Sequence, residues 1–192
     1  MFDLKLFLRV SLFLITGVSF LVFSGCKKDD PVQENEEELI TTLSLVLTPD
    51  GGGTPAAFVF RDLDGDGGNT PIITADKLAA NTTYTGEISL LNEAANPSED
   101  IAAEVKAESL EHQFFFATTT GLNISFAYND QDDNGNPLGL SIKLLTGDTS
   151  TGALRVTLRH EPDKDASGVA NGDLTNAGGE TDIEVDFTVE IE

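Results

Sequence analysis

Strict alternation of apolar and polar residues at the C-terminal end of the chain is the feature that most constrains its fold. From Asp182 to Ile191, every second residue is Ile, Val or Phe, and the residues between them are Asp, Glu or Thr. Successive side chains of a β-strand point to opposite faces, so a period of two places one face on a core and the other in water. The segment therefore predicts a strand of a half-buried antiparallel sheet.

Further segments carry the same β-strand pattern, and turns rich in Gly, Asn and Asp separate them. These segments are residues 39–47, 57–62, 83–91, 113–118, 123–128, 139–145 and 153–160. Eight strands over residues 39–192 predict an all-β fold, a two-sheet antiparallel β-sandwich with an immunoglobulin-like outline. Residues 98–109 break the pattern, because Ser98 suits an N-cap and Ile101 and Val105 would share a helical face. We expect one short helix there.

The N-terminus has the pattern of an export signal. Lys5 and Arg9 precede an uncharged stretch, residues 10–23, that is shorter than the roughly 20 residues of a membrane-spanning helix. Residues 21–26 resemble a bacterial lipobox ending at Cys26, the only cysteine. We therefore expect a lipoprotein signal peptide (1–25), a lipidated acidic tether (26–38) and a β-sandwich domain (39–192). An ordinary secretory signal and a single membrane anchor are the alternatives.

The charge balance limits the partners of the chain. Its formal net charge is -22, which repels phosphate backbones and excludes nucleic-acid binding. The same charge attracts divalent cations. With Cys26 as the sole cysteine, neither an intramolecular disulfide nor a cysteine cluster for zinc is available.

Two acidic loops have the spacing of calcium-binding loops, D-x-D-x-D-G at residues 62–67 and D-x-D-x-N-G at residues 130–135. The candidate calcium ligands are Asp62, Asp64, Asp66, Asp130, Asp132 and Asn134. The twelfth position, a bidentate Glu in EF-hands, is Ile73 in one loop and Ser141 in the other, so neither loop is an EF-hand. A calcium ion at either loop would need further ligands from elsewhere in the chain, and its role would be structural. The alternative is that both loops are ordinary acidic turns.

Both histidines stand beside a glutamate. His112 follows Glu111, and His160 precedes Glu161. Because a sandwich brings distant strand ends together, these four residues are a candidate shared site for a transition metal: zinc, copper or iron. The alternative is that each imidazole makes a hydrogen bond to a carboxylate or a backbone carbonyl.

Motifs of common enzyme classes are missing from the sequence. It contains no G-x-S-x-G elbow, no H-E-x-x-H zinc helix, no P-loop and no dinucleotide-binding glycine fingerprint. The sole cysteine is the expected lipid site, which excludes thiol catalysis. We therefore expect a protein that is not an enzyme, with no catalytic residue to name.

Several pieces of the chain resemble a group of small outer-membrane lipoproteins of Bacteroidota. The matching pieces are Cys26 with its acidic tether and residues 61–68, 78–84, 111–113, 136–140, 158–162 and 176–182. Lys27-Lys28-Asp29-Asp30 also resembles the signal that directs Bacteroidota lipoproteins to the outer face of the outer membrane. Members are sometimes labelled type 1 periplasmic binding fold proteins, whose two α/β lobes need more residues than this β-patterned chain has. The resemblance implies an accessory to nutrient or metal uptake.

The sequence thus leads to three functional hypotheses. The first is a non-enzymatic, lipid-anchored envelope protein that binds a ligand or metal ion and serves an outer-membrane uptake receptor. It would be surface-exposed, or otherwise face the periplasm. The second is a calcium-stabilised surface interaction or adhesion module. A metal-dependent hydrolase is the third and weaker alternative.

Overall fold

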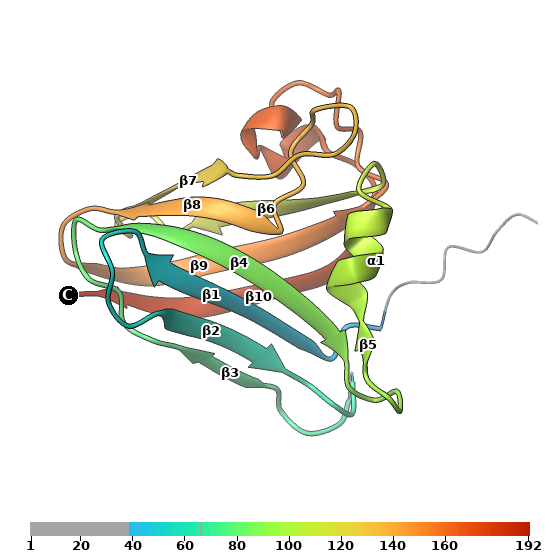
Figure 1. Cartoon of the computed structure of the whole chain (residues 1–192), viewed down its shortest axis with the longest axis horizontal. Helices are drawn as coiled ribbons and strands as arrows, with labels where there is room; N and C mark the ends of the chain where they lie inside the picture. Colours follow the sequence, from blue (N-terminus) through green and yellow to red (C-terminus); the bar gives the residue numbers. More distant parts are fainter. Residues whose placement is uncertain (1–38, 66) are drawn as a thin grey trace, which may run out of the picture. The chain divides into compact units, whose positions relative to one another are not determined.

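Two antiparallel sheets pack face to face in the computed structural model, which describes residues 39–65 and 67–192 (Figure 1). The predicted signal peptide, Cys26 and the tether lie outside the described residues. The strands are β1 (Thr42–Pro49), β2 (Ala56–Arg61), β3 (Ile72–Ala75), β4 (Thr83–Asn92), β5 (Glu99–Asp100), β6 (His112–Thr118), β7 (Ile124–Tyr128), β8 (Ser141–Thr146), β9 (Ser150–His160) and β10 (Glu180–Ile191). The helices are α1 (Ile101–Ala107) and two 3-10 turns, η1 (Val169–Asn171) and η2 (Leu174–Asn176).

The larger sheet has the strand order β3-β2-β1-β4-β8-β7, with β5 paired to β4. The smaller sheet has the order β10-β9-β6. All strand pairs within the two sheets are antiparallel. The prediction of an all-β sandwich is confirmed, and the strand order is information that the sequence pattern did not supply.

The core lies between the two sheets and follows the alternation seen in the sequence. On β10 the alternating apolar residues are all buried: Ile183, Val185, Phe187, Val189 and Ile191. Phe187 meets Phe58 of β2 with ring centroids 5.5 Å apart, which joins the small sheet to the large one. Fully burying such side chains contributes about 1.5–3 kcal/mol each, so this layer is what holds the sheets together.

Two short strands were not expected from the sequence. β3 lies at the edge of the large sheet and exposes both Ile72 and Ile73, so its residues show no alternation. β5 has only two residues. Short or fully exposed segments leave little periodic signal, because only one-sided burial produces a period of two.

The expected helix is present, but it is shorter than residues 98–109 and starts later. The N-cap is Asp100, not Ser98, and the Asp100 carboxylate accepts a hydrogen bond from the Ala103 N–H at 3.2 Å. Ile101 and Val105 are buried, as their shared face predicted. Among the described residues, no helix is long and apolar enough to span a bilayer.

Candidate functional site

The two histidines face each other across neighbouring strands. His112 begins β6, His160 ends β9, and the register pairs them directly. Directly opposed residues of an antiparallel pair have Cβ atoms about 4.5–5.5 Å apart. The ring centroids of His112 and His160 lie 4.5 Å apart. Both residues are buried, at 0% and 7% exposure. The expectation that the sandwich brings the two histidines together is therefore confirmed.

Asp182 joins the histidines through a β-bulge. The pairing of β10 with β9 shifts register between Thr181 and Ile183, which leaves Asp182 as the inserted residue. A bulge can re-aim a side chain that strict alternation would send the other way. The Asp182 side chain is 1% exposed. Its interpretation from the sequence as part of the charged, water-facing side of the strand is wrong for this reason.

The three side chains lie close enough to one another to hold an ion between them. Asp182 Oδ2 lies 3.7 Å from His112 Nε2, and Asp182 Oδ1 lies 3.7 Å from His160 Nδ1. Hydrogen bonds from nitrogen to oxygen are about 2.7–3.2 Å long. Two ligands at 2.0–2.1 Å from one tetrahedral ion are about 3.3–3.4 Å apart. We call His112, His160 and Asp182 the inner cluster; their ligand atoms all lie within 4.8 Å of one another.

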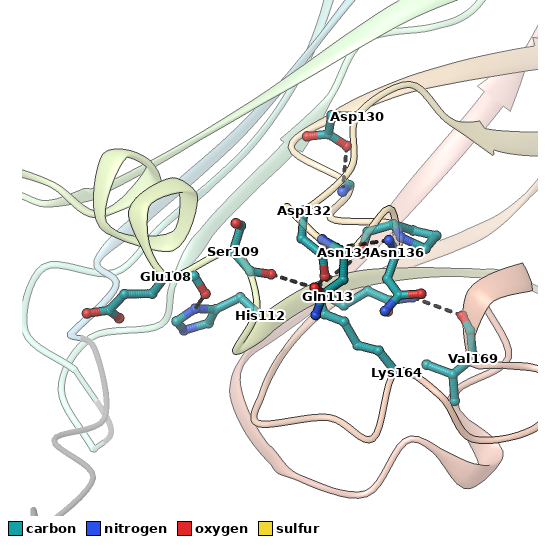
Figure 2. A network of polar contacts seen from close by, with 12 residues as sticks. Glu108, Ser109, His112, Gln113, Asp130, Asp132, Asn134, Asn136, Lys164 and Val169 are labelled. Carbon is teal, nitrogen blue, oxygen red and sulfur yellow. Dashed lines mark hydrogen bonds and ion pairs between the residues drawn. The ribbon is translucent and has the colours of Figure 1, made fainter.

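The His112 ring is held in the form that binds metal ions. Its Nδ1 lies 3.2 Å from the carbonyl oxygen of Glu108, the C-cap of α1 (Figure 2). A carbonyl only accepts, so Nδ1 carries a hydrogen, and the Nε2 side of the ring faces Asp182. Burial lowers the pKa of His112, and the nearby His160 lowers it further. The hydrogen bond to the Glu108 carbonyl raises this pKa, but the net shift is downward. The neutral imidazole is thus favoured, as metal binding requires.

Arg159 fixes the turn that leads into the bulge. Its guanidinium donates to the Gly178 carbonyl at 3.0 Å through Nε, to the Gly179 carbonyl at 2.6 Å through Nη2, and to the Thr181 hydroxyl. Gly179 has φ +66°, and a Cβ there would lie 2.1 Å from the His160 carbonyl oxygen. Only glycine fits this contact. The backbone just before Asp182 is therefore packed directly on the backbone of His160.

A second group of ligand atoms shares His160. Glu111, His160 and Glu161 also have ligand atoms within 4.8 Å of one another, and both glutamates are exposed. We call them the outer cluster. The Glu161 N–H donates to the Glu111 carbonyl at 2.6 Å. The other three metal-ligand candidates from the sequence therefore lie near His160. Asp182 is the residue that sequence reasoning missed.

The acidic loop at residues 130–135 contacts a lysine, Lys164, through the carboxylate of Asp132 (Figure 2). Lys164 Nζ donates to Asp132 Oδ2 at 2.9 Å, and the two side chains are 5% and 0% exposed. It also donates to the carbonyls of Ser109 at 2.6 Å and Pro137 at 3.3 Å. No sequence pattern indicated this ion pair, since the partners are 32 residues apart.

The other Asp132 oxygen, Oδ1, accepts the backbone N–H groups of Asn134 and Asn136, each at 2.9 Å. Burial opposes ionisation, but Lys164 and these N–H groups outweigh it and lower the pKa of Asp132. Asp130 accepts from the backbone N–H groups of Gly139 at 2.7 Å and Ser141 at 3.1 Å. Lys164 thus supplies a cation to Asp132, one of the three candidate calcium ligands of this loop, and calcium binding here stays a prediction.

The first acidic loop also directs its carboxylates at its own backbone. Asp62 accepts from the Gly65 N–H at 3.1 Å, and Asp64 accepts from the backbone and side-chain N–H of Asn69 at 3.0 and 2.6 Å. The Asn69 backbone N–H, and then its side chain, lower the pKa of Asp64. Asp66 lies outside the described residues. These contacts are typical of an acidic turn, and calcium binding here stays a prediction.

A hollow of about 500 Å³ opens where β7 meets the loop that carries η1. Phe116, Phe126 and Tyr128 line it together with polar residues, and the rings of Phe116 and Phe126 stack 5.3 Å apart. Tyr128 is held in place because its hydroxyl donates to the Phe114 carbonyl at 2.7 Å. The wall of the hollow is thus part aromatic and part polar. No sequence motif predicted this hollow.

Comparison of the chain with family models, with curated proteins and with solved structures finds no match. The resemblance to Bacteroidota lipoproteins therefore stays a prediction.

Proposed function

We propose that this protein is a lipid-anchored envelope protein whose sandwich domain binds one divalent transition-metal ion at the inner cluster. Binding, rather than catalysis, is its role. The single observation that carries the proposal is the convergence of His112, His160 and Asp182 at one buried point.

The donor set indicates the class of metal. Two imidazole nitrogens and one carboxylate suit zinc, copper or iron, whereas calcium prefers six to eight oxygen ligands. Three protein ligands leave at least one position for water or a carried ligand. The net charge of -22 raises the local concentration of cations around the domain.

The alternative, a purely hydrogen-bonded histidine–aspartate group, fits the distances less well. Both contacts to Asp182 are 3.7 Å, beyond the range of a hydrogen bond. His112 Nδ1 is used by the Glu108 carbonyl at 3.2 Å, which leaves the Nε2 side of the ring facing Asp182.

The envelope part of the proposal is supported by the N-terminal sequence. A lipidated Cys26 followed by an acidic tether would hold the domain at a bacterial outer membrane, facing the cell surface or the periplasm. A metal-binding domain held there would deliver its ion to an outer-membrane uptake receptor. We therefore propose a role as an accessory to metal-ion uptake.

Elemental analysis of the untagged full chain, purified in detergent, tests the metal proposal. We expect one zinc, copper or iron ion per chain, lost in both His112→Ala and His160→Ala. Glu190→Gln, an exposed change on β10, should keep the metal. A chain that holds none of the three metals after equilibration with each would contradict the proposal, and loss in only one histidine variant would contradict a shared site.

A further inference from the structure

The inner cluster is buried, so an ion from solution needs a route to it. The side chains of His112 and Asp182 are 0% and 1% exposed, and that of His160 is 8% exposed. His160 is therefore the most accessible of the three ligands. Any route that ends at His160 has to start with groups in contact with water.

The outer cluster provides such a start. Glu111 and Glu161 are exposed, and each offers a carboxylate oxygen within 4.8 Å of a His160 ring nitrogen. His160 belongs to both clusters, and its Nδ1 is turned toward Asp182. The two carboxylates are thus neighbours of His160, the residue that the outer and the inner cluster share.

The backbone holds this arrangement firmly. Glu161 has φ +48°, in the left-handed region that non-glycine residues rarely adopt. Its N–H bonds to the Glu111 carbonyl at 2.6 Å, and the Gly179 backbone packs against its carbonyl group. Here the conformation sets Glu161 beside Glu111.

We infer that Glu111 and Glu161 capture a hydrated divalent transition-metal cation and pass it to His112 and Asp182 through His160. This inference rests on the proposed function, since it assumes that the inner cluster is the final metal site. Paired exposed carboxylates attract a hydrated cation and accelerate its arrival. The nitrogen donors and buried carboxylate of the inner cluster then bind a first-row metal more strongly than exposed oxygens do.

The test is the rate of Co²⁺ binding to the full chain in detergent, followed by visible absorption after rapid mixing. In the Glu111→Gln/Glu161→Gln double variant we expect an association rate about tenfold lower at low salt, with less salt dependence. The final cobalt spectrum and the dissociation rate should match the unaltered protein. Glu104→Gln/Asp133→Asn removes the same charge from exposed acids of neither cluster and should associate at nearly the unaltered rate.

Each other outcome overturns the inference. An unchanged association rate in the Glu111→Gln/Glu161→Gln variant would show that the pair captures nothing. An altered final spectrum or faster dissociation would make these glutamates ligands of the final site. An equal slowing in the control variant would assign the effect to total charge. If the unaltered chain binds no Co²⁺, the proposed function fails together with the inference, whereas the first three outcomes leave it standing.

Discussion

The buried ion pair between Lys164 and Asp132 allows a stability prediction worked from its contacts. Lys164→Met keeps a long apolar chain but removes the ammonium, which contacts Asp132, Ser109 and Pro137. Asp132 would then be a buried carboxylate without its cation. Breaking a buried pair from one side costs about 3–5 kcal/mol. We expect the low end, about 3 kcal/mol, because two backbone N–H groups still bond to Asp132.

Urea unfolding of the unaltered chain and its variants measures this cost. For a domain of this size, about 3 kcal/mol corresponds to a fall in Tm of about 6–12 °C. Lys106→Met, at an exposed lysine of α1, is the control and should stay within about 0.5 kcal/mol. Lys164→Met/Asp132→Leu should be more stable than Lys164→Met, since no charge is left buried. A loss below about 1 kcal/mol in Lys164→Met would refute the reasoning.

Other predictions address the pH dependence, the core, the anchor and calcium. The folded pKa of Asp132 lies below its ordinary 3.8. The stability that its ionised form contributes is therefore complete above pH 3.8 and is lost as the pH falls through the folded pKa. The difference in unfolding free energy between Lys164→Met and the unaltered chain should accordingly become smaller in acid unfolding curves. Phe187→Ala removes a fully buried ring that meets Phe58 and should cost about 3–5 kcal/mol in urea, and a cost below about 1 kcal/mol would contradict this packing. Cys26→Ala should move the protein from the membrane fraction to the soluble fraction, and continued membrane retention would count against the lipid anchor. Calcium at residues 62–67 should raise the Tm over that in chelator, and the rise should vanish in Asp62→Asn; an unchanged Tm in the unaltered chain would remove the calcium hypothesis.

The sequence alone was sufficient for the fold class. Alternation from Ile183 to Ile191 survives as a strand with one buried face, because burial against a second sheet imposes a period of two on the residues themselves. The expected helix also formed, since Ile101 and Val105 are four apart and share a face. These features depend on residues close together in the chain, which is why the sequence pattern records them.

The candidate site was only half visible in the sequence. His112 and His160 could be named as candidate ligands, but nothing in the sequence states that β6 and β9 pair in the register that sets them opposite each other. Asp182 was assigned to the wrong face, because a bulge between Thr181 and Ile183 changes its direction. Such a bulge depends on long-range packing of the preceding turn on His160, and alternation gives no sign of it.

The same limit applies to charge. The sequence determined that this domain is strongly acidic and that its loops are rich in aspartate, because those are properties of composition and spacing. Only the tertiary structure decided which cation meets which carboxylate: Lys164 reaches Asp132 from another loop. A β-sandwich encodes its layers in local alternation, whereas its sites arise where strand ends and loops distant in the chain converge.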